Sequence, residues 1–268
     1  MTYERILDGL KRFGATERDI CIQGTGVFPE QIREKVVIAP WWEPSVLPGL
    51  GTAAFLSRSA SDAVKVWDVQ SDGAAFTYIK TGIVAPVLMD AVLSLGVTPC
   101  RKILFIGSAG SLDETIGIGD VVLPAYSVCE DGASRYLASD RLEHDCWGER
   151  VYPDPELFAA VRRAVSGVCE THGVKWHTGR NFSIDTITAQ FAHIDTILAL
   201  RCNVIEMETA AAFRAAKLAG IAIAAVFNVS DNTVVHKSLV SGRADEELRY
   251  RKYVRAEVFP RVVKKVFS

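Results

Sequence analysis

The chain has 268 residues, of which 49% are hydrophobic and 23% are charged, with 30 basic against 32 acidic side chains. This apolar content excludes disorder as the main state. The nearly balanced charge argues against a broad nucleic-acid-binding surface, which needs a basic excess. The first residues do not form a signal peptide, and no segment approaches the roughly 18 apolar residues of a membrane span. We therefore expect a cytoplasmic protein that binds neither nucleic acid nor membrane.

The six cysteines are scattered along the chain and form no C-x-x-C pair, so the sequence shows no metal-ligand spacing. In a chain of this size without an export signal we expect them to be reduced thiols. No Gly-, Ser- or Pro-rich linker divides the sequence. We expect one domain over residues 1–268, in which residues 1–35 form an N-terminal extension.

Short apolar, β-rich runs alternate with helical segments along the chain, and this alternation predicts a mostly parallel sheet covered by helices on both faces. Ligands of such folds bind beyond the carboxyl ends of the strands. Pro124 is expected to end one strand, and Pro260 to kink or break the last helix. The expected strands are 36–39, 76–80, 103–106, 120–123, 178–184, 204–205 and 221–229, and the expected helices are 86–95, 155–172, 209–219 and 245–267.

Three of these strands are followed at once by small or acidic residues. The first is followed by Gly107-Ser108-Ala109-Gly110. Small residues let the backbone approach a ligand closely, and the Ser108 hydroxyl with nearby N–H groups is suited to an anion or a sugar oxygen. An ordinary tight turn between elements is the alternative interpretation.

The second strand is followed by Glu206-Met207-Glu208 at the start of an alanine-rich helix. Acidic residues at a helix start complement the helix dipole, so a purely stabilising role is one interpretation. The other is that a carboxylate accepts hydrogen bonds from a vicinal diol while Met207 packs against a sugar face.

The third is followed by Ser230-Asp231. A carboxyl group at the end of a buried strand is partly desolvated, which raises its pKa and allows it to pass a proton to a leaving group. The alternative is a turn or helix-capping residue.

Together with two further segments, these three resemble, in order and spacing, the purine nucleoside phosphorylase/uridine phosphorylase family. That family also contains the methylthioadenosine/S-adenosylhomocysteine nucleosidases and the AMP nucleosidases. The resemblance runs from about residue 36 to residue 232 and is most specific in Glu-Met-Glu and Ser-Asp; the ends of the chain carry no motif. The further segments are Gly119-Asp120-Val121-Val122-Leu123-Pro124 and Ser183-Ile184-Asp185-Thr186.

The resemblance implies a three-layer α/β/α sandwich with a central mixed, mostly parallel sheet, and cleavage of the N-glycosidic bond of a nucleoside. It implies no metal and no organic cofactor, with inorganic phosphate as co-substrate of a phosphorylase, and a homo-oligomer (dimer or hexamer). The implied roles are Asp231 as general acid to the base; Glu208, Met207 and Glu206 at the ribose; Ser108 and Gly107 at the phosphate or other nucleophile; and Phe182, Ser183 and Asp185 at the base.

The sequence departs from the family at the phosphate site. Many phosphorylases of the family place an arginine three positions before the Ser or Thr of the glycine turn, where this chain has Phe105. Many also carry an arginine-containing loop after the first strand, where this chain has Pro40-Trp41-Trp42-Glu43-Pro44. A residue of a neighbouring subunit is one substitute, and the other candidates for the missing cation are Arg58, Lys65 and Lys80.

These departures leave three hypotheses. The first is phosphorolysis, and the second is a nucleosidase that uses water, for which Glu43 is the candidate general base. The third is a nucleoside-binding protein without turnover. Trp41, Trp42 or Phe182 are candidates for stacking on the base, with core packing or subunit contact as the alternative.

Overall fold

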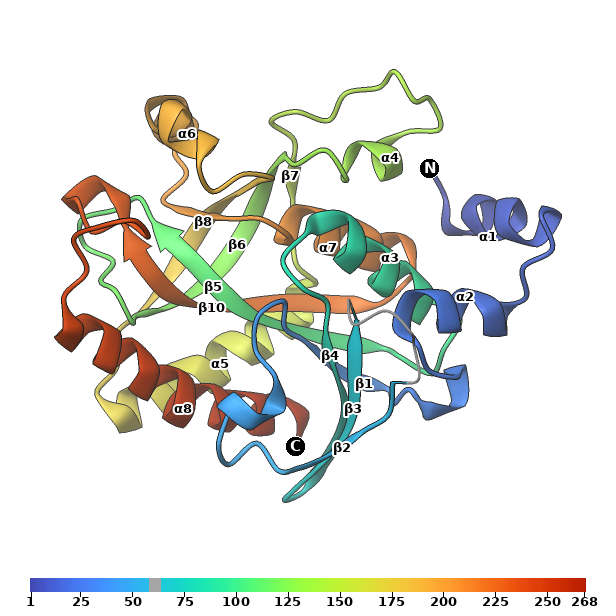
Figure 1. Cartoon of the computed structure of the whole chain (residues 1–268), viewed down its shortest axis with the longest axis horizontal. Coiled ribbons are helices and arrows are strands. Elements are labelled where there is room, and N and C mark those ends of the chain that lie inside the picture. The colour runs from blue at the N-terminus through green and yellow to red at the C-terminus, as the bar shows by residue number, and fades with distance from the viewer. Residues whose placement is uncertain (58–63) are drawn as a thin grey trace.

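A 10-stranded mixed sheet forms the centre of the structure, a computed structural model that describes residues 1–57 and 64–268 (Figure 1). Its strands are β1 (Lys35–Ile38), β2 (Thr52–Phe55), β3 (Lys65–Ser71), β4 (Ala74–Lys80), β5 (Lys102–Ser111), β6 (Val121–Glu130), β7 (Arg150–Val151), β8 (Trp176–Ile184), β9 (Val204–Glu206) and β10 (Ala222–Asn232). The helices are α1 (Tyr3–Arg12), α2 (Glu17–Thr25), α3 (Ala85–Leu95), α4 (Arg135–Ala138), α5 (Pro155–His172), α6 (Ile194–Ala199), α7 (Thr209–Leu218) and α8 (Asp245–Phe267).

Part of the sheet closes on itself. Strand β10 pairs in parallel with β5 and antiparallel with β6, and the order β6-β8-β9-β5 completes a ring with it. Strands β1 and β4 extend this ring by parallel pairing, and the antiparallel β3 and β2 end the sheet. The ring brings the ends of β5, β9 and β10 close together although they are far apart in the sequence.

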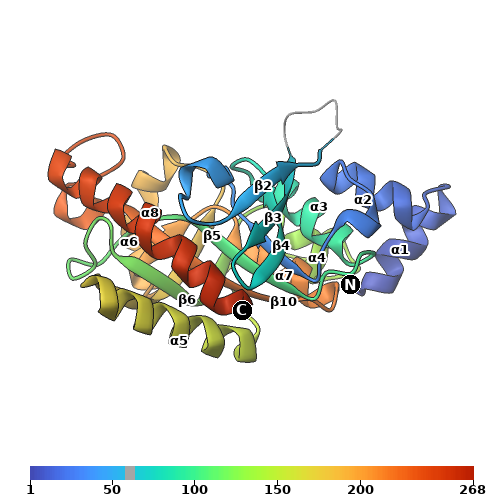
Figure 2. The ribbon, with the colours of Figure 1, turned by 90° about the horizontal axis from the view of Figure 1, so that it is seen from below.

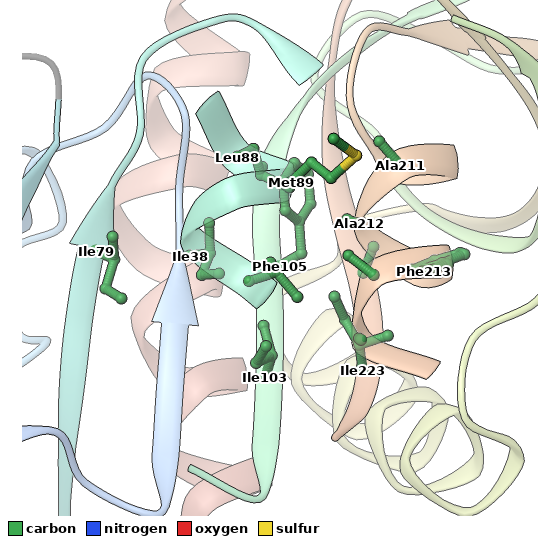
Figure 3. Close-up of a cluster of buried hydrophobic side chains, with 14 of the residues drawn as sticks. Ile38, Ile79, Leu88, Met89, Ile103, Phe105, Ala211, Ala212, Phe213 and Ile223 are labelled. Carbon is green, nitrogen blue, oxygen red and sulfur yellow. The ribbon is translucent and has the colours of Figure 1, made fainter. Parts of the chain in front are cut away.

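Helices cover both faces of the sheet, as the three-layer prediction requires. One apolar cluster joins α3 and α7 to the sheet, and Figure 3 shows Phe105 of β5 within it, among Ile38, Met89 and Ala212. A second cluster joins α5 and α8 to the opposite face. These two helices lie side by side in Figure 2. The predicted α/β/α architecture is confirmed.

Local sequence signals set the bounds of α5. Asp154 caps its first turn by accepting a hydrogen bond from the backbone N–H of Leu157 at 2.8 Å. Gly173 ends it with a φ of 62°, a left-handed conformation that glycine adopts without strain. The apolar side chains between these residues recur every three or four positions and are buried against the sheet.

Several elements continue past the residues that were expected to end them, including β9, which includes Glu206, and β10, which runs on to Asn232. Strand β5 runs through the Gly-Ser-Ala-Gly segment because β10 pairs with it as far as Ser111. Strand β6 runs through Pro124, where a bulge in the β6–β8 pairing accommodates a residue without an N–H. Helix α8 continues through Pro260, whose neighbours Val258, Phe259 and Val262 are buried in the core. That burial offsets the hydrogen bond that proline cannot make.

The six cysteines are all free and buried. Among the described residues, no helix is long and apolar enough to cross a membrane.

Candidate active site

A cavity of about 440 Å³ opens beyond the carboxyl ends of β5 and β10, where β9 passes into α7. In Figure 1 the arrowheads of β5 and β10 end together, at the side of the molecule where α8 begins. The cavity collects residues that are far apart in the sequence, from Trp41 to Arg255. Its polar lining includes Ser108, Gln190, Glu206, Glu208, Ser230, Asp231, Arg251 and Arg255, and its apolar lining includes Trp41, Trp42, Val46, Ile83, Ile187, Met207 and Leu239.

Asp231 lies at the end of β10 with only 2% of its surface exposed. The pairing of β10 with β5 shifts register between Val229 and Asp231, and Asp231 then pairs with Gly110. The extra residue of this bulge, Ser230, donates its hydroxyl proton to Asp231 Oδ1 at 2.5 Å. Burial raises the pKa of Asp231, and the hydrogen bond from Ser230 opposes that rise. A carboxyl group with a raised pKa is better suited to donating a proton than an ordinary one.

Gly110 makes room for this carboxyl group. A Cβ at Gly110 would lie 3.3 Å from both carboxylate oxygens of Asp231 and 3.1 Å from Cγ2 of Ile205. These separations are shorter than ordinary van der Waals contact, so a side chain here would displace one of the two neighbours. The lack of a side chain at Gly110 therefore leaves the space that the Asp231 carboxyl group occupies.

Glu206 is held by four hydrogen bonds from the protein itself. Its Oε1 accepts from Nδ2 of Asn181 at 2.6 Å and from Oγ of Ser183 at 2.5 Å. Its Oε2 accepts the backbone N–H groups of Glu208 at 2.7 Å and Thr209 at 2.8 Å, which are free donors at the start of α7. Glu206 thus anchors the turn between β9 and α7, and its oxygens are already occupied.

Glu208, by contrast, has capacity left for a ligand. Its side chain lines the cavity, is 5% exposed, and its Oε1 is buried without a hydrogen-bond partner in the described chain. Burial raises the pKa of Glu208 well above its usual range, and the nearby charge of Glu206 raises it further. A buried acceptor without a partner is unfavourable, so a hydroxyl donor supplied by a ligand would stabilise this group.

Ser108 lies inside β5 and is hydrogen-bonded to a cation from the far end of the sequence. Nη2 of Arg251 in α8 donates to Oγ of Ser108 at 2.8 Å. The hydroxyl accepts this bond and keeps its own proton for another partner. Burial and the neighbouring charges of Arg255 and Arg243 lower the pKa of Arg251 to about 10, while the charge of Asp231 opposes this.

Arg255 follows Arg251 by one helical turn and also lines the cavity. Its guanidinium carbon lies 5.8 Å from the centre of the Trp42 ring, and Trp42 packs edge-on against Phe259 with ring centres 5.2 Å apart. The loop after β1 is thereby tied to α8. Two arginines and a tryptophan-containing loop enclose one side of the cavity.

Four other predicted site residues do not line the cavity. Gly107 is buried, and a Cβ there would contact the rings of Phe105 and Phe227. Phe182 belongs to an apolar cluster with Leu112. Ser183 donates a hydrogen bond to Glu206, and Asp185 accepts one from the backbone N–H of Gly132. Nucleophile contact by Gly107 and base contact by the other three stay predictions.

Glu43, the candidate base for water, faces two lysines. Its Oε1 lies 3.0 Å from Nζ of Lys80 and 3.4 Å from Nζ of Lys65, and it is not among the residues that line the cavity. The hydrogen bond from Lys80 lowers the pKa of Glu43, which weakens it as a base. These ion pairs with Glu43 involve both lysines that were candidates for the missing phosphate cation. Arg58, the third candidate, lies outside the described residues.

Sequence reasoning missed Arg251, Arg255 and Gln190. The arginines lie beyond the last family motif, in a helix rich in charges. One signal was available: the two are four residues apart and border the apolar stripe that continues at Val258 and Val262. Gln190 lies in a short turn after β8 without a motif of its own.

The geometry can be set against known proteins. The sequence profile of the Phosphorylase superfamily matches residues 72–267. The chain is 38% identical over 130 residues to the uridine phosphorylase of Salmonella typhimurium, covering 48% of this chain and 47% of that protein. It is 26% identical over 183 residues to the guanosine phosphorylase of Halorubrum lacusprofundi, covering 68% of this chain and 71% of that protein. The match thus spans about half the length of the curated uridine phosphorylases.

Solved structures show the same fold. The uridine phosphorylase from Vibrio fischeri ES114 superposes with a TM-score of 0.70 at 19% identity, covering 88% of this chain and 92% of that chain. The purine nucleoside phosphorylase from Toxoplasma gondii in complex with immucillin-H gives 0.68 at 19% identity, covering 90% and 96%. The profile match over most of the sequence confirms the resemblance seen in the motifs: the chain belongs to the Phosphorylase superfamily.

Proposed function

We propose that the protein cleaves the N-glycosidic bond of a nucleoside by phosphorolysis, yielding the free base and ribose 1-phosphate. The observation that carries this proposal is the meeting of Asp231, Glu208 and Ser108 in one cavity, with the cationic Arg251 bonded to Ser108. The cavity volume of about 440 Å³ lies in the roughly 300–1,000 Å³ range of small-molecule sites.

The proposed reaction moves charge from the bond that breaks to the departing base, and Asp231 neutralises that charge. An oxygen of phosphate forms a bond to C1′ as the bond from C1′ to the base nitrogen breaks, and the electron pair of that bond leaves with the base. Asp231 gives its proton to the departing base, an effect worth roughly 10²- to 10⁴-fold. The proton that hydrogen phosphate releases passes to solvent, from which Asp231 is protonated again.

The ribose is assigned to Glu208. Its unpartnered Oε1 accepts a sugar hydroxyl, and Met207 lies beside it in the cavity wall. Glu206 holds Glu208 in position through the backbone, and a direct contact of Glu206 with the sugar stays a prediction. Fixing the sugar between the nucleophile and the proton donor supplies much of the rate enhancement through orientation.

The base faces the apolar part of the lining. Trp41, Trp42 and Ile187 offer flat or apolar surfaces, and Gln190 adds an amide that is both a donor and an acceptor. Such an amide can form paired hydrogen bonds with a base edge on which a carbonyl lies next to an N–H. This argument supports a nucleobase with such an edge but selects neither purine nor pyrimidine.

The test is turnover of a nucleoside panel with and without inorganic phosphate, followed by release of free base and ribose 1-phosphate. Phosphorolysis predicts base release only when phosphate is present, with equal amounts of the two products. Base release that continues at the same rate without phosphate would identify a nucleosidase. Binding of nucleosides without any release would identify a binding protein.

A further inference from the structure

We infer that Arg251 and Arg255 of α8, together with Ser108, form the binding site for the attacking phosphate. This inference rests on the proposed function and goes beyond it by placing the anion on a helix that carries none of the family motifs. The three residues line the same cavity, and one direct hydrogen bond of 2.8 Å already joins Arg251 to Ser108.

The two arginines have donors to spare. Arg251 and Arg255 are four residues apart in α8, so their side chains leave the same face of the helix. The Nε atoms of both are buried and make no hydrogen bond in the described chain. Guanidinium groups bind phosphate oxygens through paired N–H donors, and the Ser108 hydroxyl adds a further donor.

The excess of arginines around the cavity also favours binding of an anion. Arg243 and Arg255 both act on Arg251 with like charge, and Asp231 is the one opposite charge that acts on it appreciably among the described residues. Asp231 is a single carboxyl group, so it offsets the positive charge of these arginines only in part. A bound phosphate dianion would reduce the repulsion among the arginines.

The spacing along β5 suits a nucleophile. Ser108 and Gly110 are two residues apart on the strand, roughly 7 Å at about 3.3 Å per residue. Gly110 is the register partner of Asp231, so a phosphate bound at Ser108 would lie about two strand residues from the position of Asp231. We expect the ribose to lie between the two groups, with the phosphate approaching C1′ from the Ser108 side.

At the two positions where the family often has phosphate-binding arginines, this chain has aromatic residues that pack in the core. Phe105 occupies the position of one family arginine and packs edge-on against Phe227, with ring centres 6.0 Å apart in the core. Trp42 lies in the loop that carries the other family arginine. Its ring packs against Phe259 of α8 and lies under the guanidinium group of Arg255. Both positions are engaged in apolar packing, and the second one helps to hold the helix that supplies the arginines.

The experiment compares wild type with Arg251→Gln, Arg255→Gln and the milder Arg251→Lys, using Arg249→Gln on the exposed side of α8 as the matched control. Two quantities are measured: the rise in melting temperature caused by inorganic phosphate without nucleoside, and the KM for phosphate and for nucleoside. We expect each Gln variant to lose the phosphate-induced rise and to raise the KM for phosphate about 10- to 100-fold. Arg251→Lys should fall between, because it keeps the charge and loses the paired donors.

A second arm replaces phosphate and nucleoside by a nucleoside 5′-monophosphate alone, which tests whether the arginines hold a phosphate already attached to the sugar. Stabilisation and cleavage of the nucleotide in place of the free anion would overturn the inference. The inference would also be overturned if the wild type depends on phosphate but the Gln variants keep the wild-type KM for phosphate. In that case phosphorolysis itself would still be supported. Phosphate-independent cleavage by the wild type would instead overturn the proposed function.

Discussion

Glu206 Oε2 accepts the backbone N–H of Glu208 at 2.7 Å, so the first carboxylate of the Glu-Met-Glu segment fixes the position of the second. The same oxygen accepts the N–H of Thr209 and thereby caps α7. One residue therefore serves both the stability of the fold and the geometry of the site, and substitutions can separate its two effects.

Glu206→Gln is expected to lower the free energy of unfolding by about 1–3 kcal/mol, because the new NH₂ group must face donors that now bond to an oxygen. The nucleoside KM should rise as well, since Glu208 loses its anchor. Urea unfolding and steady-state kinetics measure the two effects. Glu156→Gln, in the exposed first turn of α5, is the control and should unfold like wild type. Equal denaturation midpoints for both variants would contradict the anchoring role.

Asp231→Asn keeps the shape of the side chain and removes the carboxyl proton that the proposed mechanism uses. We expect turnover to fall about 10²- to 10⁴-fold with little change in the KM for phosphate. Because burial raises the pKa of Asp231, the wild-type kcat should decline as the pH rises through that pKa, and the variant should lack this decline. Asp245→Asn, at the exposed start of α8, provides the control for kcat against pH. Retention of the same alkaline decline in Asp231→Asn would assign it to another group.

Glu208→Gln is expected to stabilise the fold at alkaline pH while it weakens nucleoside binding. The pKa of Glu208 is raised in the folded state, so its contribution to stability is complete below the unfolded pKa and is lost as the pH rises through the folded pKa. The variant has no charge to bury and escapes that loss. Urea unfolding at about pH 5 and about pH 8 tests this, with Glu170→Gln on the exposed face of α5 as the baseline. A gain in stability that does not grow with pH would count against burial of the Glu208 charge.

Gly110→Ala tests the space left for the Asp231 carboxyl group. The added methyl group would lie 3.3 Å from the carboxylate oxygens of Asp231 and should shift that side chain. Turnover is expected to drop about 10- to 100-fold, with a stability loss of about 1–3 kcal/mol from overpacking. Gly9→Ala in α1, where a Cβ meets nothing within 4 Å, should leave turnover unchanged. Normal kcat in Gly110→Ala would show that Asp231 tolerates displacement.

Elements with strong local signals could be predicted from the sequence. The bounds of α5 follow from a capping aspartate, apolar residues at helical spacing and a terminal glycine, all adjacent in the chain. The motifs at the ends of β5, β9 and β10 likewise predicted residues that the fold brings into one cavity. The extent of β5 and β6 could not be predicted, because it depends on pairing with β10 and β8.

The cationic side of the cavity was beyond local reasoning. Arg251 is twenty positions past Asp231, and its contact with Ser108 depends on how α8 crosses the sheet. In the sequence it is one charge among many on a charged helix. The expected homo-oligomer and the single domain over residues 1–268 stay predictions.

The registration of α8 has a further consequence. Val258 and Phe259 lock one stretch of the helix into the core, and Arg251 and Arg255 extend from the preceding turns of the same rod. A slip of one residue would rotate the arginines by about 100° and advance them by about 1.5 Å. If these arginines bind phosphate as proposed, substitutions at buried positions such as Val258 would change the affinity for phosphate without altering any residue that contacts it.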